Sequence, residues 1–179
     1  MAKPPTSWAR HRCLVVLTWL LCACSPARAD QYQDAIAKAF QGFHILSRSE
    51  FDPEIQKEVK GNPALITGRF NDDDLEDFAA IIRSDVKKLS SGKTYYDGKF
   101  VVCHAGNNGY KCQSLGTRAV YQGLELYLHR VGPGVSCLLP NGKRIKTRRD
   151  AIGTTMVPSL AGSVQMYMPD GTYYECAEH

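Results

Sequence analysis

The chain has 179 residues, of which 22 are Lys or Arg and 18 are Asp or Glu, giving a formal net charge of +4 at pH 7. Four of the basic residues (Lys3, Arg10, Arg12 and Arg28) lie in the first 29 residues, and removing that segment leaves 18 basic against 18 acidic residues. General nucleic-acid binders gain affinity from a surplus of Lys and Arg, so this balance predicts no nucleic-acid partner.

Met1–Ala29 is typical of a secretory signal peptide. Its basic residues lie around an apolar run from Cys13 to Cys24, and Ala27-Arg28-Ala29 has the small-x-small pattern of a cleavage site. The apolar run is shorter than the roughly 20 residues that a spanning helix needs, so no transmembrane helix is expected. We predict an exported protein, periplasmic or secreted, that begins at Asp30.

The same segment allows a second interpretation. Leu21-Cys22-Ala23-Cys24-Ser25 resembles the cleavage box of bacterial lipoproteins, in which Cys24 becomes the lipidated first residue. Cleavage at this box would give an outer-membrane lipoprotein with a lipid anchor at Cys24.

The remaining chain, residues 30–179, fits a single globular domain, since about 150 residues can bury a substantial core. It contains four cysteines, and an even number of cysteines in an oxidising compartment predicts two disulfides. Spacing favours Cys103–Cys112 and Cys137–Cys176.

The first predicted element is a short amphipathic helix over Gln31–Phe40, which is rich in Ala and ends before Gly42. Asp52-Pro53-Glu54 can open one helical turn. Two strands, Ala64–Phe70 and Phe78–Arg83, then surround an acidic turn. In this stretch we expect Ile66, Phe70, Phe78, Ala80 and Ile82 to pack in the core.

Asp85–Gly98 is interpreted as a polar loop, and three hairpins are predicted after it. In the first, Lys99–Ala105 and Tyr110–Leu115 surround Gly106–Gly109, which sets Cys103 opposite Cys112 at a distance that a disulfide can bridge. The second joins Val135–Pro140 to Lys143–Arg149 through Asn141-Gly142, and the third joins Ser163–Pro169 to Thr172–Cys176 through Asp170-Gly171. Both of these turns are expected to be of type I′, and the third places Tyr167 opposite Tyr174.

Ala119–Val131 fits both a strand and a helix, because its apolar residues satisfy either period. Its β-branched and aromatic residues favour a strand. The predicted fold class is α+β and mainly β. It has one N-terminal helix followed by an antiparallel sheet, or a partly closed barrel, of seven or eight short strands with two disulfides.

The acidic turn has the side-chain oxygens that Ca²⁺ prefers. Gly68–Ile82 (GRFNDDDLEDFAAII) resembles the GDFNGDGxxDFA loop of the FG-GAP and VCBS repeat families, whose Asp and Asn oxygens hold Ca²⁺ in β-propeller blades. It also resembles single copies of that loop in small exported bacterial proteins of unknown function, in which an N-terminal helix precedes it and a segment similar to Met166–Tyr174 follows. A propeller is not expected, since the motif occurs once.

The resemblance implies a Ca²⁺ site formed by Asn71, Asp73 and Asp77. Two departures favour a metal-free structural turn instead: Arg69 replaces the first Asp of the motif, and Asp74 replaces the turn Gly. Arg69 is then expected to pair with Asp73 or Asp77 as an internal counter-ion.

Catalytic motifs are not evident in the sequence. His44, His104, His129 and His179 have no zinc-ligand spacing, and the cysteines are explained as disulfides. The predicted contact surface for an acidic partner or anionic lipid is the basic run, namely Lys143, Arg144, Lys146, Arg148 and Arg149. Charged residues on an edge strand also protect against aggregation.

These patterns favour an exported, non-enzymatic binding or structural protein of the bacterial envelope, whose partner is an unknown protein or envelope component. One alternative is an enzyme that acts on an envelope substrate. Another is an inhibitor or immunity-type protein that blocks a secreted protein through the loop Gly106–Gly109.

Overall fold

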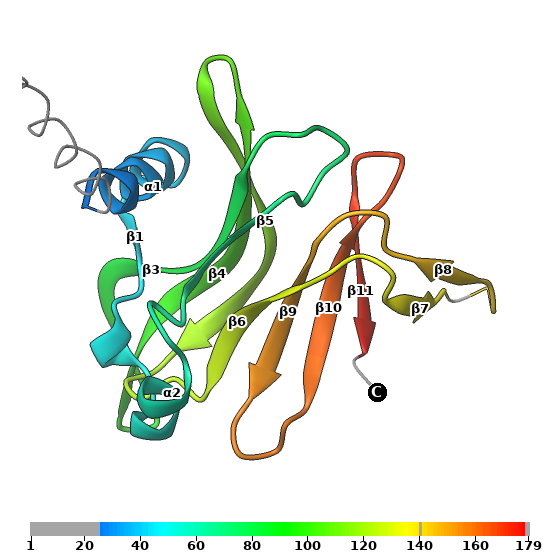
Figure 1. Ribbon diagram of the computed structural model, residues 1–179. Helices are drawn as coiled ribbons and strands as arrows, with labels where there is room; N and C mark the ends of the chain where they lie inside the picture. The colour runs from blue at the N-terminus through cyan, green and yellow to red at the C-terminus, as the bar shows by residue number, and fades with distance from the viewer. Residues whose placement is uncertain (1–25, 140, 178–179) are drawn as a thin grey trace, which may run out of the picture.

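The computed structural model describes residues 26–139 and 141–177, and this part of the chain is mainly β (Figure 1). Helix α1 (Pro26–Ala39) and the short helix α2 (Pro53–Glu58) precede most of the strands. The first sheet has five antiparallel strands: β1 (Phe43–Ile45), β2 (Leu65–Gly68), β3 (Asp77–Ser90), β4 (Lys93–Gly106) and β5 (Gly109–Val120). The second has four: β6 (Leu126–Val131), β9 (Ala151–Met156), β10 (Gly162–Tyr167) and β11 (Tyr173–Ala177). A separate hairpin consists of β7 (Ser136–Leu138) and β8 (Arg144–Lys146).

The predicted fold class is confirmed: the chain is mainly β, its sheets are antiparallel, a helix stands at the N-terminal end and two disulfides are present. The sheets are open and do not close into a barrel. The described residues contain eleven strands rather than seven or eight, and α2 adds a second helix, which begins where Asp52 accepts a hydrogen bond from the Glu54 N–H.

The additional strand length comes mainly from the segment predicted as a polar loop. Its residues instead lengthen β3 and β4, which form one long hairpin. The chain reverses direction at Ser91 and Gly92, which both have positive φ. This hairpin end has neither face buried: Val86 is 66% and Leu89 is 74% exposed. Without burial there is no alternation of apolar and polar residues, so the sequence pattern of a strand is missing.

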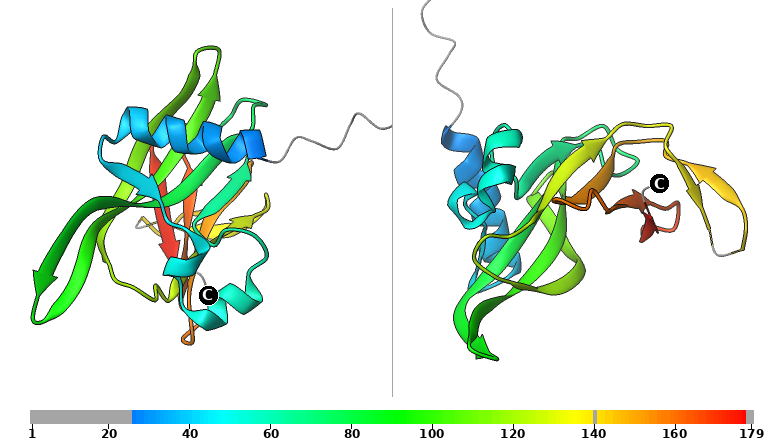
Figure 2. Two further views of the ribbon diagram at one scale, coloured as in Figure 1. Left: turned by 90° about the vertical axis from the view of Figure 1, so that its left-hand side faces the viewer. Right: turned by 90° about the horizontal axis from the view of Figure 1, so that it is seen from below.

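Helix α1 covers one face of the five-stranded sheet (Figure 2). Tyr32 and Ile36, one turn apart, are buried against Phe78, Ala80 and Ile82 of β3. The helix predicted over Gln31–Phe40 is therefore present, but it starts at Pro26, inside the predicted signal peptide. Most of Met1–Ala29, with the predicted lipidation site, lies outside the described residues, as does His179.

The opposite face of β3 packs into a second core between the two sheets. Because side chains alternate along a strand, Ala79 and Ile81 point into this core while their neighbours point towards α1. Phe70, Phe78, Ala80 and Ile82 are buried as predicted, and Ile66 is partly buried. The fully buried large side chains of the second core are Leu46, Phe51, Ile55, Phe70, Ile81, Val102 and Val120.

The ambiguous segment Ala119–Val131 is strand at both ends and loop in the middle. Strand β5 ends at Val120, β6 begins at Leu126, and Gly123 between them has φ +74°. The alternating residues Val120, Leu124, Leu126 and Leu128 are all buried. The strand prediction therefore described the burial correctly but missed the turn.

The three predicted hairpins are present, and the first has the expected register, with Cys103 paired to Cys112. The predicted type I′ turn of the third hairpin is wrong. The Gly171 N–H donates to the Met168 carbonyl and the Met168 N–H to the Thr172 carbonyl, and only Gly171 of the turn has positive φ. Pro169 favours this longer turn, since its fixed φ suits the first central position of a type I turn.

The extra turn residue shifts the pairing of β10 with β11 by one position. Tyr167 lies opposite Tyr173, with ring centroids 5.5 Å apart, and not opposite Tyr174 as predicted. The predicted type I′ turn of the second hairpin is wrong for the same reason: the Gly142 N–H donates to the Leu139 carbonyl and the Leu139 N–H to the Lys143 carbonyl.

Both predicted disulfides are present. Cys103–Cys112 cross-links neighbouring positions of β4 and β5, whereas Cys137–Cys176 joins β7 to β11 and so attaches the β7–β8 hairpin to the second sheet. Within residues 26–139 and 141–177, none of the helices has the length and hydropathy needed to cross a membrane.

Loop length predicts different contributions from the two disulfides to stability. On the chain-entropy relation, closing the separation of 9 residues stabilises by about 2.5 kcal/mol, and closing that of 39 residues by about 4 kcal/mol. We expect the double substitution Cys137→Ala/Cys176→Ala to lower the free energy of urea unfolding more than Cys103→Ala/Cys112→Ala does. An equal loss in both variants, or a free thiol in the native protein, would contradict this assignment.

Candidate functional site

A groove of about 540 Å³ lies between the β7–β8 hairpin with the segment that follows it and the turn between β10 and β11. We call this depression the basic groove. Its apolar lining includes Ile145, Met166, Tyr167, Met168 and Pro169. Its charged lining consists of Lys143, Lys146, Arg148 and Arg149 with the acids Asp72 and Asp150. The groove therefore combines an apolar lining with an excess of positive charge.

Thr147 fixes the cationic wall of the groove. Its side chain is buried, its Oγ1 accepts the Val135 N–H at 3.0 Å and its own N–H donates to the Val135 carbonyl at 2.9 Å. Because side chains alternate in extended chain, burying Thr147 turns Lys146 and Arg148 outward, and both are exposed.

The opposite wall is held by the tight turn at Pro169-Asp170-Gly171. The Asp170 carboxylate accepts hydrogen bonds from the Thr172 N–H at 3.0 Å and from its hydroxyl at 2.6 Å, and these bonds lower the pKa of Asp170. Behind the turn, Tyr167 contacts the rings of Tyr173 and His104. Contacts within the turn and behind it therefore hold this wall in place.

Four of the five residues predicted as a contact surface line the groove, and Arg144 does not. Arg149 turns back to the acidic loop, where it donates to Asp74 at 3.2 Å and to the Asp72 carbonyl at 3.1 Å. Lys143, Lys146 and Arg148 form no ion pair with any residue that the structure describes. The structure therefore leaves three cations at the groove available for a ligand.

The residues predicted to bind Ca²⁺ separate into two groups. Asn71 and Asp73 close the acidic turn together: Asn71 Nδ2 donates to Asp73 Oδ2 at 2.8 Å, and the Asp73 N–H donates to Asn71 Oδ1 at 3.1 Å. Asp77 is fully buried and makes other hydrogen bonds. No cluster of three or more His, Cys, Asp and Glu in the described part of the chain could hold a metal ion. Calcium binding by Asn71, Asp73 and Asp77 stays a prediction.

The expected pairing of Arg69 with Asp73 or Asp77 is wrong. The guanidinium lies 3.7 Å from Asp74, and the Arg69 backbone N–H donates to Asp150 at 3.1 Å. Asp73 and Asp77 are already occupied by hydrogen bonds from the turn and from buried backbone groups, whereas Asp74 is exposed. The side chain of Arg69 is 59% exposed and stays at the surface.

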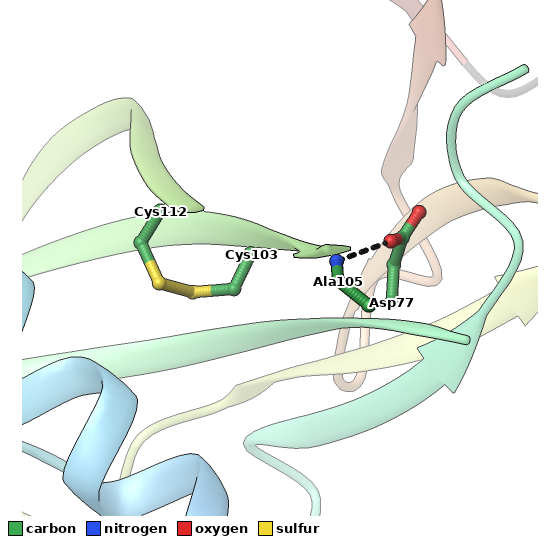
Figure 3. Close-up of a disulfide and its surroundings, with 4 residues drawn as sticks. All are labelled: Asp77, Cys103, Ala105 and Cys112. Carbon is green, nitrogen blue, oxygen red and sulfur yellow. Dashed lines mark hydrogen bonds between the residues drawn. A yellow bond between two sulfur atoms is a disulfide. The ribbon is translucent and has the colours of Figure 1, made fainter. Parts of the chain in front are cut away.

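Asp77 is the buried polar centre next to this loop. Its Oδ1 accepts the Ala105 N–H at 2.9 Å (Figure 3), and its Oδ2 accepts the Phe70 N–H at 3.0 Å. His104 Nδ1 lies 3.1 Å from the same Oδ2. A buried carboxylate is tolerated only when hydrogen bonds replace its hydration, and here they come from both the acidic loop and the end of β4.

Tyr173 extends this network to the second sheet. Its hydroxyl donates to the Phe70 carbonyl at 3.1 Å and lies 3.5 Å from His104 Nε2, and the two rings are stacked. Burial raises the pKa of Tyr173, and the charge of Asp77 raises it further. The phenol therefore stays protonated and available as a donor. The sequence contained no signal that would bring His104 to Asp77 or Tyr173.

Asp72, Tyr167 and Met168 were also not anticipated as groove residues. The only sequence signal was the turn in Met166–Tyr174, which predicts a hairpin but not what lies beside it. The loop Gly106–Gly109, predicted for an inhibitor, is an exposed turn between β4 and β5 and does not line the groove. The chain matches no known family model, no curated protein and no solved structure.

Asp77→Asn should destabilise the fold. An asparagine has one acceptor oxygen, whereas Asp77 uses both of its oxygens on backbone N–H groups, so one buried N–H would lose its partner. We expect the free energy of urea unfolding to fall by about 2–4 kcal/mol. Asp34→Asn, on the exposed face of α1, should change it by less than about 0.5 kcal/mol. Equal small effects would show that Asp77 is not a structural centre.

Tyr173 should make the protein sensitive to alkali. Folding raises the pKa of Tyr173. The contribution of Tyr173 to the free energy of unfolding is therefore complete below the pKa of the unfolded chain, near 10. Above that pH the contribution falls by up to about 1.4 kcal/mol per pH unit. Tyr173→Phe should reduce the steepness of this loss in urea unfolding measured between about pH 9 and pH 11. Some slope should remain, because burial also raises the pKa values of Tyr32 and Tyr110. Tyr121→Phe removes an exposed phenol and serves as the control.

Proposed function

We propose that this chain is an exported, non-enzymatic binding protein of the bacterial envelope, and that the basic groove binds an acidic, extended segment of another envelope protein. One observation carries the proposal: Lys143, Lys146 and Arg148 line an apolar groove without an ion-pair partner among the described residues. Cations left unpaired beside apolar surface match a ligand that carries both carboxylates and apolar side chains.

The groove suits a peptide better than an isolated anion. A small anion would need several donors that converge on one point, whereas these cations are spread from Lys143, just before β8, to Arg148, just after it. Tyr167 and Met168, which are partly exposed, provide surface for apolar side chains, and methionine adapts readily to different partners. Carboxylates at alternate positions of a strand would face the cations while the other side chains met the opposite wall.

The buried acid and histidine support a binding role rather than catalysis. Both oxygens of Asp77 accept backbone N–H groups, and Asp77 itself is inaccessible to solvent. A general base must reach its substrate, and Asp77 cannot do so. The network of Asp77, His104 and Tyr173 therefore acts to hold the fold, with the groove on its outer side.

The experiment is a binding titration by fluorescence anisotropy with a labelled peptide of alternating Glu and Leu. The double substitution Lys146→Glu/Arg148→Glu should weaken binding at least tenfold, because two attractive contacts become repulsive. The matched control is Arg144→Glu/Lys111→Glu, which makes the same change in net charge at exposed positions that do not line the groove. We expect the control to stay within about twofold of the original protein, since rim charges outside the contact act weakly at physiological salt.

Equal weakening by both pairs of substitutions would show non-specific attraction and overturn the proposal. A peptide of alternating Gln and Leu tests the charge requirement and should bind much more weakly. Binding of both peptides with the same affinity would mean that the cations do not select the ligand.

A further inference from the structure

The end of the β3–β4 hairpin projects away from the rest of the molecule (Figure 2). Pairing of β3 with β1 stops at Ser84, and pairing of β4 with β5 begins at Tyr96. Residues 85–95, which we call the arm, therefore form a two-stranded ribbon without a third strand on either edge. Six residues of β3 in the arm extend about 20 Å at the usual rise of a strand.

The arm exposes large apolar side chains to solvent. Leu89 is 74% and Val86 is 66% exposed, and Leu89 lies two residues before the turn at Ser91. Tyr121, at the base of the arm, is 44% exposed and contacts the ring of Tyr95. Tyrosine has an apolar ring with a polar end, and it is enriched where membranes meet water.

Apart from Asp85 at its base, the arm carries charges of one sign. Residues 86–95 contain Lys87, Lys88 and Lys93 and no acidic residue. The acids that border this stretch are engaged: Asp85 bonds His44 at 2.6 Å and Asp97 bonds Lys88 at 2.5 Å. Lys87 and Lys93 form no ion pair with the residues that the structure describes. The tip thus combines an exposed leucine with cations that have no local counter-charge.

A protein partner fits this shape poorly. A stable protein interface buries about 800 Å² on each side, and the end of a two-stranded ribbon offers a narrow surface. A second copy paired along the free edge of β3 in antiparallel orientation would bring Lys87 and Lys88 of one chain next to the same residues of the other, which is unfavourable. A lipid surface needs only the tip, since interfacial segments bury their apolar face about 5–10 Å deep.

We propose that the arm is a membrane-contact element, which inserts Leu89 into the surface of a bilayer that contains anionic phospholipids while its lysines bind the phosphate groups. Lysines near an anionic membrane surface each add to the attraction, and apolar burial supplies the remainder. The arm and the basic groove share no residue, so this inference is independent of the ligand that the groove binds.

The test is co-sedimentation of the exported protein with vesicles of phosphatidylglycerol and phosphatidylcholine, and separately with phosphatidylcholine alone. Binding should be strong only with the anionic vesicles and should fall as salt is raised, because salt screens the lysines. Leu89→Ser and Lys87→Gln/Lys93→Gln should each reduce the partition coefficient about tenfold.

The matched control is Leu160→Ser, since Leu160 is 73% exposed on the turn between β9 and β10, away from the arm. It should bind like the original protein, and so should Lys111→Gln/Arg144→Gln, which removes two cations at exposed positions outside the arm and the groove. Any contribution from the first 29 residues is the same in every variant and cancels in the comparison.

A second measurement reports insertion directly. Trp8 and Trp19 lie in the predicted signal peptide, so Leu89→Trp would introduce the only tryptophan of a chain that begins at Asp30. Its emission should shift to shorter wavelength with anionic vesicles, whereas that of Leu160→Trp should not. Unchanged emission would overturn the proposal. So would vesicle binding that is lost only in the groove variant Lys146→Glu/Arg148→Glu. An arm substitution that abolishes capture of an envelope protein but leaves vesicle binding intact would also overturn it.

Discussion

The buried carboxylate of Asp77 is the interaction on which the rest of the structure depends. A charge that leaves water must have its hydration replaced by hydrogen bonds, and Asp77 obtains them from the Phe70 and Ala105 N–H groups beside His104. These contacts fix the start of β3 relative to the acidic loop and to the end of β4. Tyr173 then joins the second sheet to the same point through the Phe70 carbonyl. One side chain therefore sets where two sheets meet.

The acidic loop has two sides with different roles. Its inner residue, Asp77, belongs to the core, whereas Asn71 and Asp73 close the turn on each other. Its outer residues Asp72 and Asp74 face Arg149, which reaches across from the segment after β8. The loop that resembles a calcium turn thus uses its acids for the core, for the turn and for surface arginines, since Asp74 lies near both Arg69 and Arg149. Arg149 holds the wall of the basic groove in place next to the core.

Much of the fold could be predicted from local signals. The register that brings Cys103 to Cys112 followed from a short glycine-bounded loop, and helix α1 followed from its composition and its terminal glycine. The errors arose where a distant or missing contact decides the structure. The arm has no buried face, so its sequence lacks the alternating pattern of a strand. In the third hairpin, Pro169 favours a longer turn, which places Tyr173 rather than Tyr174 opposite Tyr167. The groove could not be predicted as a site, because its walls come from separate hairpins and a loop that meet only in the folded chain.

Net charge alone would have hidden both proposed contact surfaces. The segment after the first 29 residues has as many acids as bases, yet several acids pair within the protein: Asp74 with Arg149, Asp85 with His44 and Asp97 with Lys88. Lys143 and Lys146 at the groove and Lys87 and Lys93 on the arm form no ion pair with the residues that the structure describes. Because screening limits electrostatic attraction to about 8–10 Å at physiological salt, a ligand responds to this local arrangement and not to the sum over the chain. The positions at which acids form ion pairs therefore decide where the protein can attract an anionic partner.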